Sequence, residues 1–260
     1  VKFFDTILDN RYNITYSIYM AFIVHKVADK DKLQEIYRLR YKVYCEEWGF
    51  EKPEHHPGKI ETDIFDKNAV HFIAENGGGN VVGTIRLILS SAEGFPLEKY
   101  CQVNINKNEL PKDNLAEISR LAISKEYRRR TEDKYIYGPD EERRSIGSFN
   151  NPVRAYQRRY ADRTRTDKFF EDRRVRHEAV VGLYKAVYQE SKKRQITHWY
   201  AVMTKGLYIL LSRLGINFQA IGDPVDYHGI RTPYLGDIEK MEHEVSVKNP
   251  EIFKDFTREL

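Results

Sequence analysis

The segment EISRLAIS at residues 117–124 carries ionisable side chains inside an apolar run typical of a β-strand. Side chains alternate along a regular strand, so Glu117 and Arg120 would lie on opposite faces of a sheet. A bulge would bring them to one side and would free backbone N–H groups from the ladder. Such N–H groups can stabilise an oxyanion. The spacing leaves two interpretations open, an irregular strand that carries a polar site or a plain buried Glu–Arg pair.

Three other segments also place charges beside apolar residues, namely LRYKVYCEE at 39–47, ETDIFD at 61–66 and TIRLIL at 84–89. Buried charges are costly unless they are paired, so we expect a connected and largely buried network. Its predicted members, next to Glu117, are Arg40, Glu61, Asp63, Asp66, Arg86 and Arg120. The three acids could instead hold a hard cation. Their spacing lacks the glycine of an EF-hand loop, which favours ion pairs and no metal.

Hydrophobic periodicity predicts an α/β fold. The expected strands are residues 20–27, 70–74, 81–89, 116–124, 197–203 and 216–221. One expected helix follows Asp31, which can cap it, and carries apolar residues as far as Tyr44. A second covers residues 180–188, and a third begins after Thr204 and ends at Gly215. This order predicts one mixed central sheet with helices on both faces, in a single domain over residues 1–260.

Residues 125–176 form a long, Arg-rich and core-poor insertion, with 16 Lys and Arg against 10 Asp and Glu. A segment of this length without apolar periodicity is typically functional or disordered. A solvated charged face is the simplest interpretation, and nucleic-acid binding is disfavoured by the interspersed acids. A docking surface for a small acidic protein is the more specific hypothesis. The candidate docking residues are Arg128, Arg129 and Arg130.

The order and spacing of the charged segments resemble the acyl-homoserine-lactone synthases. Within that group, LRYKVYCEEWGFE, AEISRLAISKEYRRR and YHGIRTPY are more similar to the N-acyl amino-acid synthases, specifically the acyltransferases associated with the PEP-CTERM/exosortase system. The resemblance runs discontinuously from about residue 20 to 235. It implies a GNAT-type acyl-CoA N-acyltransferase fold, in which pantetheine lies in a gap between the splayed strand at 117–124 and the strand at 197–203.

The resemblance also implies roles for individual residues. The catalytic candidates are Glu117, Ser119 and Arg120, and the substrate-binding candidates are Arg40, Tyr44, Asp63, Asp66, Arg86 and Met203. The family usually has Phe where Tyr44 stands and Trp near Phe50, and these departures concern the acceptor specificity rather than the scaffold. Cys45 has no His–acid pair placed to activate it, so we expect no covalent intermediate on it.

The predicted function is transfer of an acyl group, medium or long rather than acetyl, from a thioester to a small amine such as an amino acid. No permanently bound cofactor is expected, and the co-substrate is acyl-phosphopantetheine on a carrier protein or acyl-CoA. After Ser124 the chain reads KEYRRRTEDKYIYG and lacks the glycine loop that binds the CoA pyrophosphate, which favours the carrier. The alternative is a catalytically silent module that binds nucleic acid or an anionic protein through the insertion.

Two cysteines without metal spacing indicate a reducing, cytoplasmic location. The apolar stretch at residues 16–24 is too short to span a bilayer and predicts a strand.

Overall fold

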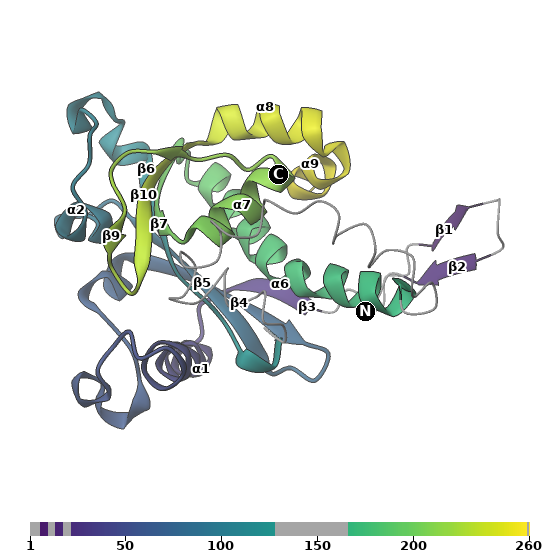
Figure 1. Ribbon diagram of the computed structural model, residues 1–260, viewed down its shortest axis with the longest axis horizontal. Helices are drawn as coiled ribbons and strands as arrows, with labels where there is room; N and C mark the ends of the chain where they lie inside the picture. Colours follow the sequence, from purple (N-terminus) through teal and green to yellow (C-terminus); the bar gives the residue numbers. More distant parts are fainter. Residues whose placement is uncertain (1–5, 10–13, 18–21, 128–165, 259) are drawn as a thin grey trace, which may run out of the picture.

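The computed structural model describes residues 6–9, 14–17, 22–127, 166–258 and 260. Within them, eight strands form one central sheet in the order β3-β4-β5-β6-β7-β10-β8, and β9 pairs with β10 (Figure 1). The strands are β3 (Phe22–Val27), β4 (Ala69–Asn76), β5 (Val81–Leu89), β6 (Leu115–Ile123), β7 (His198–Met203), β8 (Gln219–Ala220), β9 (Val225–Asp226) and β10 (Ile230–Asp237). Neighbouring strands are antiparallel except β6 and β7, which are parallel. A separate hairpin pairs β1 (Thr6–Asp9) with β2 (Ile14–Ser17).

Helices cover both faces of the sheet. They are α1 (Lys30–Tyr41), α2 (Pro96–Tyr100), α6 (Thr166–Lys193), α7 (Lys205–Leu214), α8 (Ile238–Lys248) and α9 (Pro250–Thr257). Helix α1 continues as a π-helical turn, η1 (Lys42–Glu47). Short 3₁₀ turns are η2 (Pro53–His55), η3 (Pro57–Lys59), η4 (Ile64–Asn68), η5 (Lys107–Glu109), η6 (Lys112–Asn114) and η7 (Lys125–Tyr127).

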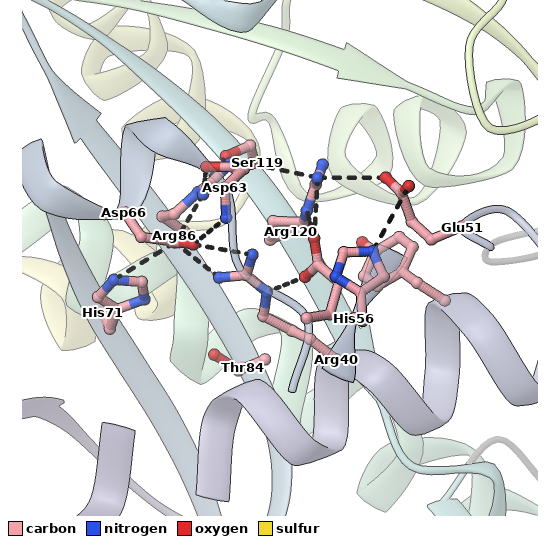
Figure 2. Close-up of polar contacts among 12 residues, drawn as sticks. Arg40, Glu51, His56, Asp63, Asp66, His71, Thr84, Arg86, Ser119 and Arg120 are labelled. Atoms are coloured by element: carbon pink, nitrogen blue, oxygen red, sulfur yellow. Dashed lines mark hydrogen bonds and ion pairs between the residues drawn. The ribbon is translucent and has the colours of Figure 1, made fainter. Parts of the chain in front are cut away.

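Side-chain alternation in the central strands separates an apolar face from a polar one. On the apolar face, Ile85 and Leu87 pack with Val180 and Leu183 of α6 in the main core, which also includes residues of α7, α8 and α9. On the other face, Arg86 contacts Ser119 and Asp63 (Figure 2). Helix α2 packs on that face through a smaller apolar cluster. The expected mixed sheet with helices on both faces is confirmed.

Helix ends follow the sequence signals, with corrections. Thr204 accepts a hydrogen bond from the Leu207 N–H group, and Gly215 ends α7 with a φ of +91°, as predicted. The capping prediction for Asp31 is wrong, because Asp29 accepts the N–H groups of residues 31 and 32 while Asp31 lies in the first turn of α1. The strand expected at 216–221 is also too long, since Ile216 still bonds to the last turn of α7. Pairing there is limited to Gln219–Ala220.

Much of the Arg-rich insertion, including Arg128, Arg129 and Arg130, lies outside the described residues. Helix α6 begins at Thr166 and therefore already occupies the end of that segment. Of the helices that the structure describes, none combines the length and the apolar character needed to cross a bilayer.

Candidate active site

Strand β6 is irregular at Arg120. Thr84 and Arg86 of β5 pair with Ala122 and Ser119, so two residues of β6 stand opposite Ile85 alone. This is a β-bulge, and Arg120 adopts a φ of +51°, in the left-handed region that side chains rarely enter. Such backbone strain persists only where surrounding contacts hold it, and it is common at active sites. The bulge predicted from the sequence is confirmed.

The bulge coincides with the point where β6 and β7 separate. Their parallel pairing ends at Ile118 and Ala201, and no described strand pairs with residues 119–123 on the side facing β7. A cleft of about 600 Å³, including its open mouth, lies in this gap. Its lining comes from residues 118–123 of β6 and 201–203 of β7, with Val43, Tyr44, Trp48, Phe50, Tyr184, Leu207 and Arg231. The predicted positions Ser119, Arg120, Tyr44 and Met203 all line it.

The π-helical turn η1 positions Tyr44 at this cleft. Its hydroxyl donates a hydrogen bond of 3.1 Å to the Leu121 carbonyl oxygen in the bulge. The same ring lies 5.4 Å below the Arg120 guanidinium. A π turn re-aims side chains relative to an α-helix and is frequent at functional sites. Tyr44 therefore supports the distorted backbone as well as the cleft wall.

The predicted ion-pair network lies directly beside the bulge (Figure 2). Arg40 pairs with Glu61 and forms a bidentate contact with Asp66, at 2.7 and 3.2 Å. Arg86 reaches Asp63 at 2.7 and 3.0 Å and Asp66 at 2.6 Å. The two guanidinium groups are 0% and 1% exposed, so the pairing is what makes their burial tolerable.

Arg120 joins this network from the bulge. Its guanidinium contacts Glu61 at 3.0 Å, Asp63 at 3.2 Å and Glu51 at 3.6 Å. The connected network is confirmed. The alternative of a plain Glu117–Arg120 pair is wrong, because Arg120 pairs with other acids.

Local capping holds the acids in place. Asp63 precedes η4 and accepts the Phe65 N–H at 2.9 Å, while Asp66 accepts the Asp63 N–H at 2.8 Å. This reciprocal capping box fixes the backbone of the ETDIFD segment independently of the arginines. Each of the two carboxylates therefore accepts a backbone N–H group and also pairs with an arginine of the network.

The network keeps its acids ionised. Burial alone would raise the pKa of Glu61, but Arg120 and Arg40 outweigh it and hold this pKa at about 2. Burial likewise opposes the charge on Asp66, and Arg40 and Arg86 hold its pKa well below the usual range. His71 lies beside Asp66, yet burial lowers its pKa to about 4, so it is neutral at pH 7.

Glu117 is in a different environment. It is 2% exposed, and one carboxyl oxygen accepts the Leu97 N–H at 2.9 Å, which ties the start of α2 to the sheet. It forms no ion pair with a described residue. Burial raises its pKa to about 8, against smaller opposing contributions from the Leu97 N–H, Arg86 and Arg120. Glu117 lies on the strand that forms the cleft but does not line the cleft itself.

The loop between β9 and β10 and the start of β10 pack against the aromatic residues of the cleft wall. His228 has a φ of +57°, its ring lies against those of Tyr44 and Phe50, and its Nε2 is 3.4 Å from Glu51. Arg231 lies over the Phe50 ring, with 5.5 Å to its centroid. The YHGIRTPY segment therefore forms a constrained turn that presents both a His and an Arg.

Sequence reasoning missed two residues of this site. Glu51 links Arg120, His56 and His228. Its signal was weak, an acid directly after the aromatic loop that contains Trp48 and Phe50. Tyr184 was predicted only as core, because its place at the cleft depends on the separation of β6 from β7.

Residues 39–137 match the model of a family described as an acetyltransferase (GNAT) domain. This range contains η4, β4, β5 and β6, and with them the ion-pair network and the bulge. The overall fold of the chain also recurs in solved structures. The fold is a GNAT fold.

Among those structures, the acyl-homoserine lactone synthase BjaI has a TM-score of 0.55 and 18% identity, with 89% of each chain covered. TofI, solved with an inhibitor and MTA, has a TM-score of 0.54 and 17% identity over 90% of this chain and 100% of its own. FeeM, an N-acyl amino acid synthase from uncultured soil microbes, has a TM-score of 0.51 and 14% identity, covering 86% and 93%. No curated protein sequence matches significantly. The match of residues 39–137 to an acetyltransferase domain supports an acyltransferase.

Proposed function

We propose that this GNAT protein is an N-acyltransferase that moves a medium or long acyl group from a thioester to the amine of a small acceptor. The observation that carries the proposal is the open cleft between β6 and β7, because a closed gap filled by large side chains would favour a silent binding module. The edge of β6 that faces the cleft has no partner among the described strands beyond Ile118, so its backbone N–H groups are available to an oxyanion.

The transfer itself needs no covalent intermediate on the enzyme. The acceptor nitrogen attacks the thioester carbonyl carbon, a C–N bond forms, and the C–S bond breaks to release a thiol. One proton leaves the ammonium before attack, and another passes from nitrogen to sulfur. Holding both substrates in one cleft supplies much of the acceleration.

The charge of the network supports an amine as the acceptor. Glu51, Glu61, Asp63 and Asp66 face three arginines, an excess of one carboxylate. Glu51 and Asp63, with 22% exposed side chains, are more accessible than the other two acids and suit the ammonium group. Arg231 lines the same cleft and suits a carboxylate. An ammonium and a carboxylate together favour an amino acid.

Glu117 is the proposed proton acceptor. A carboxyl group with a pKa near the working pH combines a useful ionised fraction with enough basicity, and such catalysis contributes about 10²–10⁴-fold. Since Glu117 does not line the cleft, the proton would reach it through water. Ser119 lines the cleft and accepts a hydrogen bond of 3.0 Å from Arg86 Nε, so we propose that Ser119 and Arg120 orient the reacting groups.

We propose acyl carrier protein rather than CoA as the preferred donor, because the chain lacks the glycine loop that holds the CoA pyrophosphate. BjaI is described as CoA-dependent, so acyl-CoA is the necessary comparison. Docking through Arg128, Arg129 and Arg130 and membership of the PEP-CTERM/exosortase-associated group are part of the same proposal. Cys45 and Cys101 are both free thiols, which supports a cytoplasmic location.

Mass spectrometry of lipid extracts from expressing cells tests the activity. The wild type should accumulate N-acylated small molecules, and Glu117→Gln should reduce them by at least about 10²-fold at equal protein level. Identical extracts from the wild type, the variant and empty-vector cells would contradict the proposed function. Binding of nucleic acid by the same wild-type protein would then favour the silent module.

A further inference from the structure

Tyr184 of α6 lies between two cavities. One is the cleft already described, where its ring is close to Met203 and Leu207. The other is an apolar cavity of about 390 Å³, including its open side, between α6, β7 and the C-terminal helices. Tyr188, Trp199, Ile238, Met241, Val245 and Phe256 are among its lining residues. Tyr184 is the residue that both cavities share.

The Tyr184 ring is held by apolar packing rather than by a polar contact. Its side chain belongs to the main core and is 2% exposed, and its hydroxyl makes no hydrogen bond with a described residue. By contrast, the Tyr188 hydroxyl one helical turn later donates to Glu242 at 2.7 Å. Burial alone raises the pKa of Tyr184 well above its ordinary value. The ring can therefore be removed without leaving a described hydrogen-bonding group unpaired.

The second cavity suits a hydrocarbon chain. The one charged residue in its described lining, Glu242, already pairs with Tyr188 and with Lys192 at 2.8 Å. The remaining lining is aliphatic or aromatic, so an apolar chain would meet no uncompensated charge there. Because the two cavities meet at Tyr184, the favoured occupant is an acyl chain that extends from the donor cleft.

We propose that Tyr184 sets the upper limit of acyl-chain length, because its ring closes the donor cleft against this second cavity. The inference rests on the proposed acyl transfer. With Tyr184 in place, the chain ends against the ring. Without it, the distal carbons of a longer chain extend into the second cavity, where each buried methylene strengthens binding about fourfold.

The first test measures kcat/KM along a series of acyl thioesters of increasing length. Tyr184→Ala and the milder Tyr184→Leu should move the optimum to longer chains, while Tyr184→Phe, which keeps the ring, should retain the wild-type profile. Filling the second cavity by Val245→Phe in the Tyr184→Leu background should restore the shorter optimum. Circular dichroism and thermal unfolding identify any variant that fails to fold, and Tyr184→Leu preserves most of the packing.

The second test does not depend on turnover. The sequence has two tryptophans, Trp48 in the donor cleft and Trp199 in the second cavity. In a Trp48→Phe background, a non-reactive thioether analogue with a terminal bromine on a long chain should quench Trp199 only when Tyr184 is also replaced by Leu. The matched control is the same analogue with a short chain, which should leave Trp199 unquenched in both proteins.

The outcomes separate the two proposals. A wild type that transfers no acyl group of any length refutes the proposed function. An active wild type whose length profile is unchanged in both Tyr184→Ala and Tyr184→Leu refutes the role of Tyr184 alone. Equal quenching of Trp199 with and without the Tyr184 ring also refutes it.

Discussion

Replacing Glu117 by Gln should change how the stability of the protein depends on pH. The substitution keeps the shape of the side chain, and the amide oxygen can still accept the Leu97 N–H, so the contact between β6 and α2 is retained. What it removes is the titration of a buried carboxyl group. The change therefore isolates one ionisation from the packing around it.

The expected magnitude follows from the pKa of Glu117, which burial raises from 4.5 to about 8. Because the folded protein holds this proton more tightly, the contribution of Glu117 to stability is fully present below pH 4.5 and is lost as the pH rises through 8. Each pH unit in that window corresponds to about 1.4 kcal/mol, so between pH 5 and pH 9 the wild type should lose about 4 kcal/mol relative to Glu117→Gln.

Urea unfolding of both proteins at pH 5, 7 and 9 measures this difference. Other groups titrate over the same range, but they are common to both proteins and cancel in the comparison. Exposed Glu251→Gln controls for the loss of an acidic side chain. A difference between wild type and Glu117→Gln that stays constant from pH 5 to pH 9 would refute the view that Glu117 is buried as a neutral acid.

Three further substitutions or comparisons test the site. Arg86→Ala should destabilise the fold by about 3–5 kcal/mol and abolish transfer, because Asp63 and Asp66 lose a buried partner. An unchanged urea midpoint with full activity would contradict this. Tyr44→Phe should lower the free energy of unfolding in urea by only about 1 kcal/mol, since it removes one hydrogen bond to Leu121 but keeps the ring. A loss of stability similar to that of Arg86→Ala would contradict this. With the same acyl group on both carriers, kcat/KM for acyl carrier protein should exceed kcat/KM for acyl-CoA at least about tenfold. Equal kcat/KM values for the two donors, or a preference for an acetyl group, would refute the proposed donor.

The sequence was sufficient to predict the ion-pair network, because a buried arginine needs a carboxylate and the chain offers few segments that combine both with apolar neighbours. The bulge was expected from the family resemblance. The spacing of Glu117 and Arg120 left it open, since a regular strand cannot place both residues on one face.

The start of α1 was not predictable in this way, because Asp29 and Asp31 are both suitable capping residues and lie two residues apart. Features set by long-range contacts were not predictable either. The partner of Glu117 is the N–H of Leu97 in α2, which lies 20 residues earlier in the chain. Glu51 is positioned beside His228 of the β9–β10 loop. Tyr184 reaches the cleft because β6 and β7 separate. Neither arrangement leaves a periodic pattern in the sequence.

The most direct test of acyl transfer uses the purified protein, a long-chain acyl carrier protein thioester and a mixture of amino acids. Free thiol and N-acyl product are measured together, the second by mass spectrometry. The account predicts that thiol is released only when an amine acceptor is present, in equal amount to the N-acyl product, and that Glu117→Gln slows both equally. Thiol release without an acceptor, or no release with any thioester, would contradict it.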